Sequence, residues 1–276
     1  MSAAGMMAKG GCALFEKDSL GNWQRVRNLR HYKNIFEPVT DGLIQSLQFN
    51  GELTDNSGNG WNGTYSAGSP TYVTGQVGNA LSLDGSHNVD AGSTDSLMNY
   101  FTGTNCWAVA CWIKTTQSGY VWALYDDAWT NYIGLYIEND GNPTIYRKGV
   151  GYSETPLNLG IDLMDENWHL IYCSYDPVSY DSPYLFICVD GNFSGAYYDY
   201  VIDTGVISAD VFSHYTIGYA NSAYYTGSVD QYRVFNRDLD SVEVVSLYEE
   251  IASGLWVRDR AVKYKDNAGD WKRVNV

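Results

Sequence analysis

The chain has 276 residues, of which 45% are hydrophobic and only 18% are charged, with 24 Tyr, 28 Gly and 9 Trp. This composition excludes a wholly disordered chain and favours strands and turns over helices. No apolar run approaches the roughly 18 residues of a membrane-spanning helix, and the formal net charge of −15 excludes a nucleic-acid binder that works by neutralising phosphates.

Charge is distributed unevenly along the chain. Residues 1–40 contain six Lys/Arg against three Asp/Glu, and residues 254–276 contain the same numbers. Residues 41–253 contain five Lys/Arg against 26 Asp/Glu. Such asymmetry is typical of separate modules with separate partners. We therefore expect a basic N-terminal segment (1–40), an acidic domain (41–253) and a basic C-terminal segment (254–276).

The two basic segments contain a repeat. Residues 17–26 (KDSLGNWQRV) align without gaps on residues 265–274 (KDNAGDWKRV), with six of ten positions identical. Each copy predicts a hairpin, which is too small to hold a core alone. The hairpins either extend the main sheet or serve as docking or oligomerisation elements, and duplication at both ends favours docking. The docking residues would be Trp23, Arg25, Trp256, Trp271 and Arg273.

The chain start lacks a continuous apolar segment of signal-peptide type. The five cysteines are an odd number without paired spacing, which is a poor disulfide framework, and no CxxC or HxxxH spacing indicates zinc. We expect four of them to be small buried hydrophobes: Cys106, Cys111, Cys173 and Cys188. These features predict folding in a reducing cytoplasm, which fits a virion protein released by lysis.

Residues 41–251 predict one all-β domain. Short apolar runs alternate with Gly-, Asn- and Pro-rich breakers, and strands are expected at 78–83, 107–114, 120–124, 132–137, 168–175, 184–190 and 228–235. A helix should follow Asp240, because Asp240 and Glu243 form a capping box. A β unit of about 210 residues predicts an antiparallel two-sheet sandwich or jelly roll.

Motifs along this domain resemble those of laminin-G-like, concanavalin A-like lectin/glucanase domains. DNSGNGWNGT resembles the family's "D-x-S-G-N-G-x-x-G-T", and GQVGNALSLDG resembles its "G-x-x-G-x-A-L-x-F-D-G". The matching motifs lie, in the family's order, at residues 55–64, 75–85, 107–114, 167–176, 186–191, 217–237 and 239–248. The resemblance implies a jelly roll that binds carbohydrate or protein or serves in assembly, often with calcium near the sheet rim. Fold alone does not settle function.

Catalysis has little support in the sequence. Related jelly-roll glycoside hydrolases carry E-x-D-x-E or E-x-D-x-x-E on one strand, and their chemistry needs two paired carboxyl groups. The nearest match, residues 160–166, begins with Gly160 and so lacks the nucleophile. The four histidines lie far apart and no G-x-S-x-G elbow occurs. We therefore predict a non-enzymatic protein in which His169 is structural.

Two kinds of binding site are expected in the domain. Calcium prefers oxygen ligands, and four candidates lie beside Gly-rich turns, where they could instead cap the turns: Asp55, Asn59, Asp84 and Asp230. Sugars stack on aromatic faces, although Tyr and Trp are also ordinary strand residues. The candidate platform residues are Trp122, Tyr125, Trp129, Tyr132, Tyr198, Tyr224 and Tyr225.

The G-[ND]-W-x-R-V and Y-K units of the terminal segments resemble segments at the ends of phage virion proteins. We therefore predict a phage structural protein, such as a capsid decoration, head fibre or tail appendage, that displays a lectin-like domain toward host glycans. Its partners would be other virion proteins or further copies of the chain, such as a trimer. The alternatives are a soluble cellular carbohydrate-binding protein and, less favoured, a glycoside hydrolase.

Overall fold

The chain divides into two compact units, Val39–Tyr248 and the combined termini Met1–Pro38 with Glu249–Val276. The computed structural model describes residues 4–7, 14–17, 23–25, 39–101, 105–148, 159–177, 184–193, 197–200, 212–256, 263–265 and 271–273. The first unit, called the body below, contains the predicted sandwich.

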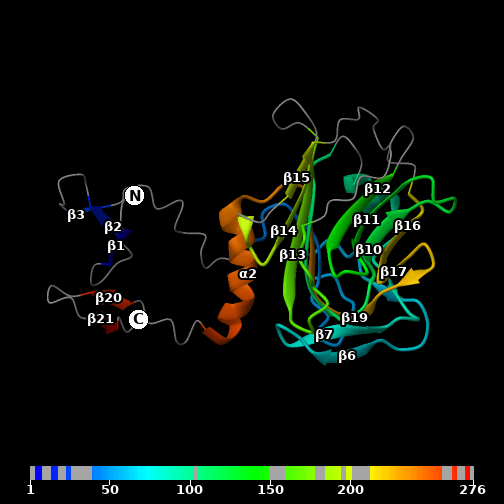
Figure 1. Cartoon of the computed structure of the whole chain (residues 1–276), viewed down its shortest axis with the longest axis horizontal. Coiled ribbons are helices and arrows are strands. Elements are labelled where there is room, and N and C mark those ends of the chain that lie inside the picture. The colour runs from blue at the N-terminus through cyan, green and yellow to red at the C-terminus, as the bar shows by residue number, and fades with distance from the viewer. Residues whose placement is uncertain are drawn as a thin grey trace. The chain divides into compact units, whose positions relative to one another are not determined.

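The body consists of two antiparallel sheets that face each other (Figure 1). The eight-stranded sheet has the order β15-β14-β13-β9-β19-β7-β6, with β4 also paired to β19. Its strands are β4 (Leu43–Leu47), β6 (Thr71–Thr74), β7 (Asn79–Asp84), β9 (Trp107–Thr115), β13 (His169–Asp176), β14 (Tyr184–Val189), β15 (Tyr197–Tyr200) and β19 (Thr226–Phe235).

The six-stranded sheet has the order β12-β11-β10-β16-β8-β5. Its strands are β5 (Thr64–Tyr65), β8 (Val89–Asp90), β10 (Gly119–Tyr125), β11 (Tyr132–Ile137), β12 (Pro143–Lys148) and β16 (His214–Ile217). A small hairpin, β17 (Tyr219–Ala220) with β18 (Ala223–Tyr224), follows β16, and α1 (Asp95–Met98) leads into a 3-10 turn, Asn99–Phe101. The antiparallel sandwich expected from the sequence is confirmed, and each of its seven predicted strands is present.

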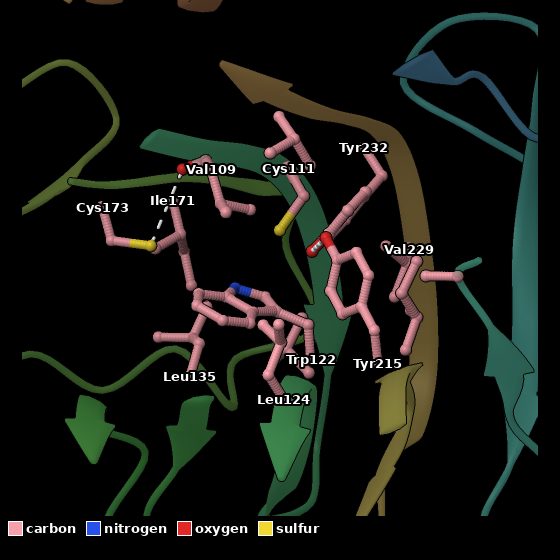
Figure 2. Close-up of a cluster of buried hydrophobic side chains, with 14 of the residues drawn as sticks. Val109, Cys111, Trp122, Leu124, Leu135, Ile171, Cys173, Tyr215, Val229 and Tyr232 are labelled. Carbon is pink, nitrogen blue, oxygen red and sulfur yellow. Dashed lines mark hydrogen bonds between the residues drawn. The ribbon is translucent and has the colours of Figure 1, made fainter. Parts of the chain in front are cut away.

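Large aromatic and aliphatic side chains fill the space between the two sheets. Trp107, Trp122, Phe101 and Tyr215 are among the largest fully buried side chains, and Trp122 packs edge-on against Trp107 with ring centroids 6.0 Å apart. Figure 2 shows the Tyr215 and Tyr232 hydroxyls meeting in this core, 2.6 Å apart. Because Tyr215 lies on β16 and Tyr232 on β19, this hydrogen bond joins the two sheets.

The cysteines behave largely as predicted. Cys111, Cys173 and Cys188 are buried and free, whereas Cys106 is half-buried and its sulfur accepts the N–H of Asp238 at 3.0 Å. Burial raises the pKa of Cys106 to about 12, so its thiol stays protonated and acts as a structural hydrogen-bond partner. Cys12 lies outside the described residues.

The predicted helix is α2 (Ser241–Trp256), and its capping box forms as expected. Asp240 Oδ1 accepts the N–H groups of Val242 and Glu243, while Glu243 Oε2 accepts the N–H of Asp240. These bonds satisfy N–H groups that have no partner within the helix. Tyr248 of α2 stacks on Trp112 of β9, with centroids 5.4 Å apart, so the part of α2 that belongs to the body packs on the outer face of the eight-stranded sheet (Figure 1).

The repeated terminal motif forms the same hairpin twice. In one sheet β1 (Ala4–Met7), β2 (Leu14–Lys17) and β3 (Trp23–Arg25) pair in order, and in another β20 (Lys263–Lys265) pairs with β21 (Trp271–Arg273). Lys17 is opposite Trp23, and Lys265 is opposite Trp271. The side chains of the predicted docking residues, Trp23, Arg25, Trp256, Trp271 and Arg273, lie outside the described part of the chain, so their role stays a prediction.

Candidate functional site

The outer face of the six-stranded sheet carries a cluster of aromatic side chains. Ile133, Leu135 and Ile145 point into the core, so the residues that alternate with them point outward. Strand register places these outward residues in rows across the sheet. The first row is Lys148, Tyr132, Tyr125 and His214; the second is Tyr146, Gly134, Ala123, Thr216 and Asp90; the third is Thr144, Tyr136 and Tyr120. We call this surface the aromatic face.

Trp129 is the partly exposed ring that a rigid loop adds to this face. It stacks on Tyr125 with centroids 4.3 Å apart and planes 13° apart. Its backbone has φ 56°, a left-handed conformation that is uncommon for a bulky residue and that the surroundings must enforce. The Trp129 N–H donates to the Asp126 carbonyl at 3.1 Å, which closes the turn.

The carboxylate of Asp126 holds this loop in place. It accepts the N–H and hydroxyl of Thr130 at 2.8 and 2.6 Å, and the side-chain amide of Asn131 at 2.7 Å. Although burial raises the pKa of Asp126, these hydrogen bonds lower it overall. The ionised carboxylate thus orders the loop, and Trp129 is oriented before any ligand arrives.

The β17–β18 hairpin forms the neighbouring part of the aromatic face. Ala220 is fully buried against Tyr120, Ala123 and Tyr125, so the hairpin lies over the small residues of the second row. Tyr219 and Tyr224 are in ring contact at its open side, with centroids 4.4 Å apart. Tyr224 is 37% exposed, and it extends the aromatic surface beyond the sheet.

Polar groups lie among these rings. His214 stacks on Tyr125 at 4.8 Å, and its Nε2 lies 2.6 Å from Asp127 Oδ1. At the other side of the face, the Tyr146 hydroxyl donates to Glu138 Oε1 at 2.6 Å. Burial raises the pKa of Tyr125 to about 12, so its hydroxyl remains a neutral donor. Flat rings beside carboxylate acceptors suit a ligand with apolar faces and many hydroxyl groups.

The structure corrects part of the predicted platform. Trp122 and Tyr225 are 0% exposed and pack in the core, so neither can touch a ligand at the surface. Tyr125 and Tyr132 are each 7% exposed and act mainly as supports for other rings. The side chain of Tyr198 lies outside the described residues.

Sequence reasoning missed other members of the aromatic face. These are Tyr120, Tyr136, Tyr146, His214 and Tyr219. One signal was available, because the run YIGLYI of β11 alternates Tyr132, Gly134 and Tyr136 with three aliphatic residues. Such alternation is typical of a strand with one face on the core and one face outward.

Asp55 does not have the surroundings of a metal ligand. Its Oδ1 accepts the N–H groups of Ser46 and Ser57, each at 2.9 Å, and its Oδ2 accepts the Ser57 hydroxyl and the N–H of Trp61. Four donors from the chain thus occupy a nearly buried carboxylate. Asn59, the neighbouring candidate, uses its side-chain amide to cap the Ile44 carbonyl at 2.8 Å.

Asp230 is buried within the eight-stranded sheet, away from any shared carboxylate cluster. Its Oδ2 accepts the N–H groups of Gln76 and Val77 at 2.8 and 2.9 Å, while its Oδ1 has no hydrogen-bond partner. Burial raises the pKa of Asp230 to about 6, against the opposing effect of those N–H groups. Its role in the structure is to anchor the turn between β6 and β7.

Asp84 is an exposed turn acid. The hydroxyl and N–H of Ser86 hold its pKa at about 2, and Ser86 and Asp84 both contact the same ring nitrogen of His87, Nδ1. A Ser-His-Asp relay needs the two partners on opposite nitrogens, so this trio is not a catalytic triad.

The calcium candidates therefore do not fit a common site. The described residues contain no group of three or more His, Cys, Asp or Glu side chains that could hold a metal ion. N–H and hydroxyl donors surround the Asp55 and Asp230 carboxylates, whereas Ca²⁺ needs six to eight oxygen ligands. Calcium binding stays a prediction from the sequence.

His169 has the structural surroundings expected for it. Its Nδ1 lies 2.8 Å from Asp190 and its Nε2 lies 3.1 Å from Asp165. The hydrogen bond to Asp190 is the main cause that raises the pKa of His169. With both ring nitrogens bonded to carboxylates, the imidazole ties the loop before β13 to the turn after β14.

Comparison with known families gives one matching family model. The model, described as the concanavalin A-like lectin/glucanases superfamily, matches residues 83–245. A comparison with curated protein sequences gives no match. Within the described part of the chain, no helix is both long and apolar enough to cross a membrane.

Solved structures share the fold at low sequence identity. Domain 4 of AbnA, a GH43 extracellular arabinanase from Geobacillus stearothermophilus, solved with arabinotriose, is 17% identical with a TM-score of 0.60, over 75% of this chain and 98% of that one. The binding domain of Paraclostridial Mosquitocidal Protein 1 is 14% identical with a TM-score of 0.61, over 76% of this chain and 52% of its own.

The receptor binding domain of a botulinum neurotoxin mosaic serotype C/D is 16% identical with a TM-score of 0.58, over 77% of this chain and 51% of its own. The chain thus spans about half the length of the toxin domains and nearly all of the arabinanase domain. At these identities the comparisons establish the fold alone.

Proposed function

Since the chain belongs to the concanavalin A-like lectin/glucanase superfamily, we propose that it is a non-catalytic, lectin-like protein that binds carbohydrate on its aromatic face. Trp129 carries this proposal. Its indole is partly exposed and stacks on the Tyr125 ring with centroids 4.3 Å apart. Its backbone has a left-handed conformation within a hydrogen-bonded loop. Backbone strain of this kind tends to be kept where it orients a functional group, and sugars stack on such rings.

The placement of the carboxylates around the rings supports the non-catalytic part of this proposal. Asp127 is paired with His214, and Glu138 accepts the Tyr146 hydroxyl, so these carboxylates lie beside different elements of the face. Glycoside hydrolysis needs an acid and a nucleophile, or an acid and a base, placed across one glycosidic bond. The similar arabinanase structure is domain 4 of its enzyme, solved in complex with arabinotriose.

Substitution of the stacked indole tests carbohydrate binding. We expect Trp129→Ala to weaken binding at least tenfold on a glycan array and in calorimetry with the glycans that the native protein binds, because the indole offers a flat apolar surface on which a sugar ring can stack. Tyr248→Ala is the matched control, since Tyr248 is also exposed and stacked, but on the opposite sheet. Equal affinity for the native protein and Trp129→Ala would reject the aromatic face as the binding surface.

We further propose that the terminal hairpins attach this domain to a larger assembly, either a phage particle or further copies of the chain. Two observations support this: the basic segments form hairpins of identical register, and they flank a body with 26 acids and five bases. The acidic body would then project outward and present the aromatic face to host glycans.

Substitution of the paired tryptophans tests this attachment in the full chain. We expect Trp23→Ala combined with Trp271→Ala to reduce particle incorporation and to shift the oligomer toward monomer in sedimentation velocity. The matched Trp→Phe pair, which keeps an aromatic ring opposite each lysine, should retain most assembly. Unchanged incorporation and an unchanged sedimentation coefficient in the alanine variant would contradict a docking role for the hairpins.

A further inference from the structure

We propose that the aromatic face selects uncharged oligosaccharides and rejects those that carry carboxylate or sulfate groups. This inference rests on the carbohydrate-binding function proposed above and specifies its ligand class. Three features of the face lead to it: the sign of its charged groups, the use of its backbone N–H groups, and the placement of its basic side chains.

The ionised groups on the aromatic face are mainly acidic. Asp127, with 84% of its side chain exposed, lies at one side beside His214, and Glu138 lies at the other side beside Tyr146. Asp90 ends the second row of the face. Asp127 and Glu138 use one oxygen each in these contacts, which leaves a second oxygen to accept a hydrogen bond from a sugar hydroxyl. The same carboxylates repel an acidic substituent.

Backbone N–H groups that could have bound an anion are already used by the chain's own carboxylates. In the loop under Trp129, the N–H groups of Thr130 and Asn131 donate to Asp126. At the end of the second row, the N–H groups of Gly92 and Ser93 both donate to Asp90 Oδ1 at 2.8 Å. Successive N–H groups of this kind form a nest, which is a common anion site. In both nests the bound anion is a carboxylate of the chain itself.

The arginine of β12, whose side chain is best suited to anion recognition, points away from the aromatic face. Arg147 of β12 lies between two outward residues, so its side chain points to the inner side of the sheet, where it is 5% exposed. Its Cζ lies 4.8 Å from the centroid of the Tyr175 ring. Its neighbour Lys148 lies on the aromatic face, with its Nζ 5.8 Å from the Tyr132 centroid. A lysine is a point charge and lacks the fork with which arginine grips a carboxylate or sulfate.

The electrostatic field of the whole domain also disfavours anionic glycans. Residues 41–253 contain 26 acids against five basic residues, so an anionic glycan approaches a surface of like charge. Such repulsion slows association and is screened by salt over roughly 8 Å at physiological ionic strength. A neutral oligosaccharide is insensitive to this field. Its hydroxyl groups can donate hydrogen bonds to the second oxygens of the two carboxylates.

The first test is a glycan array in which each neutral oligosaccharide is printed beside its own sialylated and sulfated forms. We expect the full-length protein to bind neutral members and to lose binding at least tenfold when an acidic group is added. Tighter binding to the acidic member of a pair would overturn the charge selection and leave carbohydrate binding intact. Absence of binding to every glycan would overturn both proposals.

The second test neutralises the face without changing its shape. Asp127→Asn with Glu138→Gln keeps the acceptors for His214 and Tyr146 and removes two charges. We expect affinity for neutral glycans to fall modestly, because each new amide places an N–H donor where the carboxylate had an acceptor oxygen. The ratio of acidic-form affinity to neutral-form affinity should rise about fivefold at low salt, because two repelling charges are gone. The control, Asp41→Asn with Glu52→Gln, removes two charges near β4 and should raise this ratio much less, because only the field of the whole domain changes. An equal gain in variant and control, or no gain in the variant, would contradict the proposal.

Discussion

Trp122→Ala is expected to lower the free energy of unfolding by about 3–5 kcal/mol, as for large core aromatics in general. Trp122 is 0% exposed and contacts Trp107 and Phe101 with ring centroids 6.0 and 6.2 Å away. Removing the indole leaves a cavity lined by rings that cannot collapse into it, because strands on both sides are fixed by their ladders. Figure 2 shows the indole enclosed by labelled side chains such as Leu135 and Ile171.

Chemical denaturation followed by circular dichroism measures this change. Total stability of a domain is about 5–15 kcal/mol, so the loss should be a large share of it. Trp129→Ala is the control, because Trp129 is partly exposed, and we expect this substitution to lower the free energy of unfolding much less. A different result would contradict this placement. If the free energy of unfolding of Trp122→Ala lay within about 1 kcal/mol of the native value while glycan binding was lost, Trp122 would be a ligand contact.

The contrast between Trp122 and Trp129 explains which parts of the site the sequence could predict. The run GYVWALY of β10 contains no charged residue and is buried throughout. The sequence therefore does not show which of its side chains point away from the core. A β-bulge between Tyr120 and Trp122 also shifts the alternation, which places Tyr120, Ala123 and Tyr125 outward. Period-two reasoning therefore recovered the strand but could not assign the direction of each ring.

The adjacent tyrosines 224 and 225 show the same limit. Tyr224, at the end of β18, is exposed, and the next residue, Tyr225, is buried. Two adjacent tyrosines in a sequence do not indicate which one points outward. The fold itself was predictable, because turn motifs such as DNSGNGWNGT have local causes: three of the four donors to Asp55 come from within six residues. The seven other strands of the two sheets were not predicted: β4, β5, β6, β8, β12, β15 and β16. Four of them, β5, β6, β12 and β15, are edge strands, and strand pairing depends on register, which local sequence does not encode.

Candidate metal residues were predicted by residue type, without knowledge of the groups that surround them in the fold. Asp230 lies in an irregular part of β19, where Gln231 has φ 49°, and the carboxylate is turned toward the N–H groups of a distant turn, 154 and 153 residues away in the chain. Only the folded topology brings that turn over β19. A carboxylate beside a glycine-rich turn therefore indicated a cap as readily as a calcium ligand, and the hydrogen bonds identify the cap.

The hydroxyl pair of Tyr215 and Tyr232 should show strong coupling in a double-mutant cycle. Both rings are 0% exposed, and the two hydroxyls lie 2.6 Å apart between the sheets. Burial raises the pKa of both residues, so both hydroxyls remain protonated and one donates to the other. Replacing either tyrosine with Phe leaves the partner's hydroxyl buried without a hydrogen bond, which costs about 1–3 kcal/mol.

The double variant removes both polar groups together and leaves two apolar rings of nearly the same shape. Because a buried pair replaced by apolar groups can be close to neutral, Tyr215→Phe with Tyr232→Phe should cost less than the sum of the single changes, with a coupling energy of about 1–2 kcal/mol. Denaturation of the four proteins gives this value, and Tyr224→Phe, on an exposed ring, should change stability by less than about 0.5 kcal/mol. Additive single effects would mean that the hydroxyls find other partners, and the hydrogen bond would then contribute little to holding the two sheets together.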